Sequence, residues 1–411
     1  MMTHHAFALP AGLRELRALL AESGHLDDLP ASPQWEATAS LASRHHLGPA
    51  VFPRFVQIAE GSDVLAPCLR SLWWEFLAAR FTAQKIYEDA VAVLDKLVGA
   101  GIRVIALKGL HLVSGGYAEP GSRPMGDIDL LVPPDQVWQA WSVLRKDGFI
   151  PATDIDEAQA GLFPLHLPRL VKPHTTPIEL HRAITSPLLR RQIAVEGLWQ
   201  RSRPLVVGPH TIAGLCAEDL LLHLCMHATH QHRCQVPLRC IHDISQVIQG
   251  ASGGVGWAAL LEIARISGTE RPLFCGLLLA EQLFSAPVPA DVLQSLVPGA
   301  NRAGILAAAM DSIMHFDTPA GPLARLRVAP GLMPARIANA ARELFSGPEI
   351  IASTTRADPL LSRLRAYWRL FAKVAARNRE FSARLASGDP GARAEMRVAR
   401  SIASIESWMA E

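Results

Sequence analysis

The chain has 411 residues, of which 49% are hydrophobic and 19% are charged, a composition that excludes an intrinsically disordered protein. Its formal net charge of +2 argues against a basic, nucleic-acid-binding surface that extends over the whole protein. This length exceeds that of a typical single domain, so we expect a mainly helical protein with two or three packed units.

The sequence gives no sign of export or of membrane insertion. Its first residues lack a basic cluster followed by an apolar core, so no secretory signal is expected. The longest uncharged run, residues 244–261, is interrupted by Gln, Ser and four Gly, which excludes a transmembrane helix. The six cysteines form no CxxC pair, which indicates reduced thiols without disulfides. We therefore expect a cytoplasmic protein without a membrane span.

The first half of the chain changes from helical to alternating patterns. Apolar residues at helical spacing over 13–100 predict a helical N-terminal region. The β-branched run at 102–107 predicts a buried strand that turns into a helix at 108–117. Residues 126–132, GDIDLLV, predict a second strand, and residues 134–149 resume the helical period. The predicted order is strand, helix, strand, helix.

Two further extended segments are predicted at residues 164–172 and 176–184. Beyond about residue 186 the α/β pattern ends and helices return, among them residues 217–231, 241–250 and 257–268.

These patterns predict an α+β fold, in which a small α/β core is flanked by N-terminal and C-terminal helical regions. We predict four regions, namely an N-terminal helical region at 1–100, the α/β core at 101–185, a helical domain at 186–320 and a basic C-terminal helical region at 321–411.

Two aspartates lie in the second predicted strand. Because side chains alternate along a strand, Asp127 and Asp129 project to the same side, with Cα atoms about 6 to 7 Å apart. Such a pair either raises its pKa values or recruits a cation, and its oxygen ligands suit Mg²⁺, with Mn²⁺ as an alternative. Glu179, which alternates with Ile178 and Leu180, is the candidate third acid of a two-metal site. The alternative is exposed strand acids without a metal.

The turn before this acidic strand is a candidate phosphate site. The chain passes from strand to helix through Gly109, where free backbone N–H groups face an anion. Lys108 adds a positive charge there, or is a solvated residue at a helix start. Arg123, four residues before Asp127, is placed to contact phosphate oxygens with two parallel hydrogen bonds. Together these residues predict a nucleotide-binding clamp.

The segments LKG, PGSRPMGDIDLLV and IELH, in this order, resemble the uncharacterised nucleotidyltransferase family of the DNA polymerase beta superfamily. The resemblance implies a mixed sheet, metal ligands at Asp127, Asp129 and Glu179, and a nucleotide turn at Lys108 and Gly109. The sequence departs from the superfamily pattern in having Lys108-Gly109 where a Gly-Ser pair is usual, and in a longer gap before Asp127.

From these residues we expect transfer of a nucleoside monophosphate from a triphosphate, with ATP favoured, to an acceptor, with release of pyrophosphate. A small molecule or a peptide or protein is the favoured acceptor, and Glu179 is the favoured proton acceptor. The alternative from another class is a nucleotide-binding regulatory module without turnover.

A histidine cluster forms a rival site. His223, His227 and His230 lie at i, i+4 and i+7, on one face of a helix, where they could hold Zn²⁺ in a metallohydrolase. Neutral buried histidines are the commoner explanation. His227 and Asp243 are expected to tie two helices together or to approach the cleft from the helical side. His181 is expected to support the metal ligands or to act as a base.

The C-terminal region is basic. Residues 321–411 contain fifteen Lys and Arg against eight Asp and Glu, and residues 363–385 interleave Arg with apolar side chains. This pattern is typical of an amphipathic helix with a solvated basic face, and it leaves binding of nucleic acid or another polyanion as an alternative.

Overall fold

The computed structural model describes residues 10–21, 33–59, 65–116, 120–157, 163, 165–185, 192–251, 254–297, 299–318, 376 and 379–410. The chain divides into two compact units. One comprises Met1–His232 and Val236–Leu306, and the other comprises Arg233–Gln235 and Ala307–Glu411. The four predicted regions remain a prediction.

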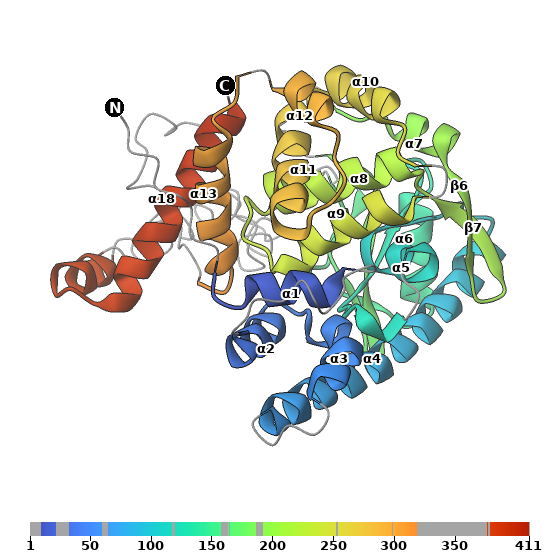
Figure 1. Ribbon diagram of the computed structural model, residues 1–411. Helices are drawn as coiled ribbons and strands as arrows, with labels where there is room; N and C mark the ends of the chain where they lie inside the picture. Colours follow the sequence, from blue (N-terminus) through green and yellow to red (C-terminus); the bar gives the residue numbers. More distant parts are fainter. Residues whose placement is uncertain are drawn as a thin grey trace. The chain divides into compact units, whose positions relative to one another are not determined.

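A seven-stranded mixed sheet forms the centre of the first unit, with the order β3-β4-β5-β2-β1-β7-β6. Strand β2 pairs in parallel with β5 and antiparallel with β1, and β1 pairs in parallel with β7. Helical regions flank this sheet, which confirms the predicted fold class (Figure 1). The strands are β1 Ile105–Ala106, β2 Ile128–Leu131, β3 Ile150–Pro151, β4 Leu170–Lys172, β5 Thr175–His181, β6 Arg203–Val207 and β7 His210–Gly214.

The hairpin of β6 and β7 corrects the expectation that the chain is helical beyond residue 186. Its two strands pair antiparallel and extend the sheet through β1. The turn depends on Gly208, whose φ of 58° lies in the left-handed region that favours glycine. A short strand that begins with Arg-Pro between helical segments gives only a weak strand signal, which is why the pattern missed it.

One face of the sheet is apolar and supports the hydrophobic core. Ile128 and Leu130 of β2 and Ile178 and Leu180 of β5 are buried in one cluster with residues of α4 and α6. Helix α4 spans Ala66–Gly99 and ends before Gly101, whose φ is 73°, and α6 spans Val137–Lys146. Because strand side chains alternate, the residues between these apolar ones project from the opposite face. That face carries Asp129 and Glu179.

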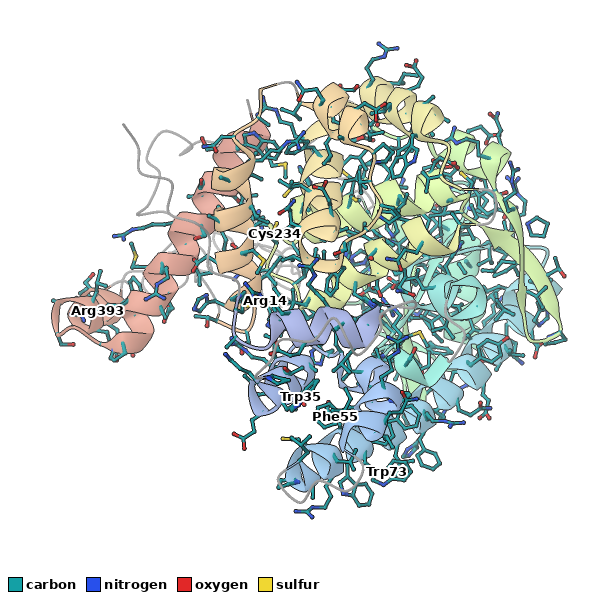
Figure 2. The ribbon with its side chains drawn as sticks, in the orientation of Figure 1. Arg14, Trp35, Phe55, Trp73, Cys234 and Arg393 are labelled. Atoms are coloured by element: carbon teal, nitrogen blue, oxygen red, sulfur yellow. The ribbon has the colours of Figure 1, made fainter. Side chains whose placement is uncertain are left out.

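Three N-terminal helices precede α4, namely α1 Leu13–Leu20, α2 Trp35–Arg44 and α3 Gly48–Ala59. Trp35 and Phe55 lie edge to face with ring centroids 5.9 Å apart. Both residues are labelled on the N-terminal helices in Figure 2. Phe52 contacts Trp73 at 5.4 Å and Phe76 at 4.9 Å between ring centroids, which ties α3 to α4. This region is helical, as predicted.

The helices after the hairpin confirm the predicted helical segments. Helices α8, α9 and α11 pack against one another (Figure 1). Helix α8 continues into a π-helical segment, η4. The bounds are α7 Val195–Arg201, α8 Ala217–Cys225, η4 Met226–Gln231, α9 Leu238–Gly250, α10 Trp257–Ser267, α11 Glu270–Phe284 and α12 Ala290–Leu296.

The second unit contains most of α13, Arg302–Met314, and all of α18, Pro390–Ala410. The Ser401 hydroxyl donates to Asp311 at 2.6 Å between these helices. Of the basic stretch at 363–385, residues 363–375, 377 and 378 lie outside the described residues, so the polyanion prediction has no structural description here.

None of the six cysteines, all of which lie within the described residues, forms a disulfide. Among the described residues, no helix is both long and apolar enough to cross a membrane.

Candidate active site

The pairing of β2 with β5 places two acids side by side. Asp129 is the register partner of Glu179 in this parallel pair. His181, two residues further along β5, projects from the same face as Glu179. One ligand atom from each of these three residues lies within 4.8 Å of the others, and no other group of three ligands does so in the described part of the chain. The sheet register therefore assembles this site.

Asp129 is the buried centre of the site, with 3% of its side chain exposed. Its Oδ1 atom accepts a hydrogen bond from Lys108 Nζ at 2.8 Å and lies 2.8 Å from Nε2 of His181. Burial alone would raise the pKa of Asp129, but these two partners hold it well below its usual value. Asp129 is therefore ionised at neutral pH.

His181 supports both acids. Its Nε2 atom also lies 3.6 Å from Oε2 of Glu179. Burial would lower the pKa of His181, but hydrogen bonds to Asp129 and Glu179 raise it above the usual value. The hydrogen bond with His181 in turn lowers the pKa of Glu179. Both acids thus carry negative charge on one face of the sheet.

Asp127 lies immediately before β2 and outside the group of three. Burial and repulsion from Asp129 and Glu179 raise its pKa. Nη2 of Arg169 lies 3.3 Å from Oδ2 of Asp127. Sequence reasoning missed Arg169, although a basic residue in the extended segment 164–172 was a signal that could have found it.

The strand-to-helix turn is fixed against β2. The backbone N–H of Leu107 donates to the carbonyl of Asp129 at 3.0 Å, and helix α5, Lys108–Gly115, begins directly afterwards. At Gly109, a Cβ atom would lie 2.9 Å from both Arg123 Nη1 and Met125 Sδ. This close approach explains why glycine occupies that position.

A protein family described as uncharacterised nucleotidyltransferase matches residues 31–285, which is more than half of the chain. The chain belongs to this family. No curated protein and no solved structure matches the chain. The matched region contains the sheet, the acids and the turn, so the nucleotidyltransferase family and the site geometry coincide on the same residues.

Arg123 is directed toward the helical side of the site. Its Nε donates to Oδ1 of Asp243 at 3.1 Å, and its Nη2 donates to Oδ2 at 2.8 Å. The two side chains are 7% and 2% exposed, and Nη1 of Arg239 lies 3.6 Å from the same carboxylate. Asp243 therefore joins α9 to the loop before β2, while the phosphate contact of Arg123 stays a prediction.

The histidine cluster does not form a three-ligand site within the described residues. The rings of His223 and His227 lie 6.5 Å apart, and η4 changes the helical spacing before His230. Both ring nitrogens of His223 are buried, and they find no hydrogen-bond partner in the described part of the chain. Burial, followed by the charges of Lys108 and His181, lowers the pKa of His223 to about 3. The pKa of His227 also lies well below its usual value because of burial.

The acids of this nucleotidyltransferase fit a hard divalent cation. Asp127, Asp129 and Glu179 offer carboxylate oxygens, which are the ligands that Mg²⁺ and Mn²⁺ prefer. Lys108 and His181 both contact Oδ1 of Asp129, and the register partner of Asp129 on β5 is Glu179. Asp129 and Glu179 thus lie on two paired strands, and Asp127 directly precedes one of them.

Proposed function

We propose that this chain transfers a nucleoside monophosphate from a nucleoside triphosphate, with ATP favoured, to an acceptor in a magnesium-dependent reaction. The observation that carries the proposal is the register pair of Asp129 and Glu179, two ionised acids on neighbouring strands. Family membership supports the general activity. The acceptor that we favour is a small molecule or a peptide or protein that carries a nucleophilic oxygen.

The reaction forms one bond and breaks one bond. The acceptor oxygen bonds to the α-phosphorus, the bond from that phosphorus to the pyrophosphate oxygen breaks, and pyrophosphate leaves with its electron pair. The divalent ion, when bound, supplies charge neutralisation for the triphosphate. Asp127, Asp129 and Glu179 would hold it.

Side chains in and around the acidic group have three further proposed roles, namely to accept a proton, to position the acids and to contact phosphate. Glu179, which is 18% exposed, is the proposed acceptor of the proton that leaves the attacking hydroxyl. His181 fixes both Asp129 and Glu179 in position through the contacts at 2.8 and 3.6 Å. The helix start at Lys108 and Gly109 is the proposed contact for phosphate oxygens.

The test is pyrophosphate release from each of the four ribonucleoside triphosphates with Mg²⁺. We expect release by the wild-type chain and none by the double variant Asp127→Asn, Asp129→Asn. Asp135→Asn is the matched control, because Asp135 is an exposed acid in the loop after β2.

Release that survives in the double variant would contradict the assigned site. Magnesium-dependent nucleotide binding without release, even with candidate acceptors present, would favour a regulatory module without turnover. Absence of both binding and release would overturn the proposed function.

A further inference from the structure

A lysine ammonium already stands at the centre of the acidic site. Lys108 Nζ lies 2.8 Å from Asp129 Oδ1, and the two side chains are 17% and 3% exposed. Asp127 and Glu179 lie close enough to act on the charge of Lys108. The sequence predicts two metal ions at this site, and a lysine ammonium group among the acids affects how many ions can bind there.

We propose that the ammonium group of Lys108 takes the place of a second divalent ion, so that the site holds one divalent ion per chain. This inference rests on the proposed function and specifies the charge arrangement at the same site.

The ammonium group of Lys108 occupies one of the two oxygens of the Asp129 carboxylate. Lys108 and His181 both contact Oδ1 of Asp129, so an additional ion on that oxygen would have to displace Lys108 or lie directly beside its positive charge. Repulsion between cations is strong at such a distance in a water-poor site. The Oδ2 atom and the Glu179 carboxylate remain for one ion.

The positive charges of nearby side chains offset the negative charges of the three acids. The three carboxylates carry three negative charges when all are ionised. Lys108 cancels one of these charges, and a single divalent ion cancels the other two. Arg169 adds a further positive charge beside Asp127 at 3.3 Å. The protein's own cations therefore offset part of the negative charge that a second metal ion would otherwise neutralise.

The backbone of Lys108 adopts a conformation that is uncommon for lysine. Its φ of 40° lies in the left-handed region, where residues other than glycine are uncommon. Glycine would adopt this conformation without strain, so a lysine here indicates that the side chain itself is used. The surrounding contacts maintain this conformation at the helix start, from which Nζ reaches Asp129.

The experiment counts Mn²⁺ ions, because Mn²⁺ is visible by electron paramagnetic resonance and binds to the same oxygen ligands. The chain is titrated with Mn²⁺ in the presence of one equivalent of a nonhydrolysable nucleoside triphosphate analogue. Bound ions per chain are measured, together with the magnetic coupling that two ions about 4 Å apart would show. The variants are Lys108→Met, Lys108→Arg and, as a control, Lys96→Met on α4, where Lys96 is half-exposed.

We expect one uncoupled Mn²⁺ in the wild type, in Lys108→Arg and in Lys96→Met, and two coupled ions in Lys108→Met. Two ions in the wild type would overturn the inference while leaving the proposed function intact, and this result needs no variant to fold. One ion in a folded Lys108→Met chain would also overturn it. Failure of the chain to bind the analogue or release pyrophosphate would instead overturn the proposed function, and the inference with it.

Discussion

The sheet face of β2 and β5 and the helical segment of α8 and η4 each carry three side chains of types that bind metals. On the sheet, ligand atoms of Asp129, Glu179 and His181 lie within 4.8 Å of one another. On the helical segment, the rings of His223 and His227 are 6.5 Å apart, and the π-helical turn separates His223 from His230. Similar residue types thus produce two different local structures.

The difference lies in how each element sets distance. Hydrogen bonds between paired strands hold register partners about 5 Å apart, so one residue on each strand is enough to bring two acids together. A helix face needs an unbroken 3.6-residue period, and one π turn changes it. The sheet also surrounds its acids with Lys108 and His181, whereas burial lowers the pKa values of His223 and His227 and keeps them neutral.

The largest expected effect concerns the ion pair that joins the loop before β2 to α9, a helix that packs against α8. Asp243→Ala removes the carboxylate that Arg123 contacts twice in a buried setting, and we expect a loss of about 3 to 5 kcal/mol in the free energy of unfolding. Urea denaturation measures this loss in the free energy of unfolding. The double variant Arg123→Met, Asp243→Leu should lose less, because Arg123 is then no longer a buried charge that has lost its carboxylate partner. An equal or larger loss in the double variant would contradict this account.

A second prediction concerns the acid pair on the sheet. Glu179→Gln removes one negative charge beside Asp129 while keeping the size of the side chain. We expect pyrophosphate release to fall by about 10² to 10³-fold, the usual effect of removing one electrostatic group from an active site. Steady-state assays at saturating Mg²⁺ measure the rate, with thermal melting to check folding. A rate within tenfold of wild type would remove Glu179 from the site.

A third prediction concerns the pH dependence that the buried histidines impose. The pKa of His223 is about 3 in the folded chain and about 6.5 when unfolded, so between these values the unfolded state binds more protons. Stability therefore falls as pH decreases from 6.5 toward 4, with up to about 1.4 kcal/mol per pH unit from this residue. His223→Leu should make that slope shallower in urea denaturation at several pH values. An unchanged slope would show that His223 titrates normally.

The smallest expected effect is that of His227→Gln. Because the three helical histidines do not converge in the described structure, metal content after purification and pyrophosphate release should both remain unchanged. Elemental analysis and the release assay measure these quantities. Loss of a stoichiometric zinc ion in this variant would restore the helical cluster as a metal site and reverse the comparison.

The sequence by itself determined the parts of the molecule that depend on local periodicity. Alternation along residues 126–132 and 176–184 predicted both acidic strands, and helical spacing predicted α4, α8, α9 and α10. The α/β core flanked by helices followed from the order of these segments, and the mixed sheet was implied by the family resemblance. The hairpin of β6 and β7 did not, because a short edge strand depends on pairing with β1 rather than on its own pattern.

Tertiary structure alone decided which residues meet. The contacts of Lys108 with Asp129, Arg123 with Asp243 and Arg169 with Asp127 join residues 21, 120 and 42 positions apart, and local spacing carries no information at such separations. It also decided that the helical histidines do not converge, because a π turn is set by packing. Strand register brought the acids together, and packing around them placed the cations.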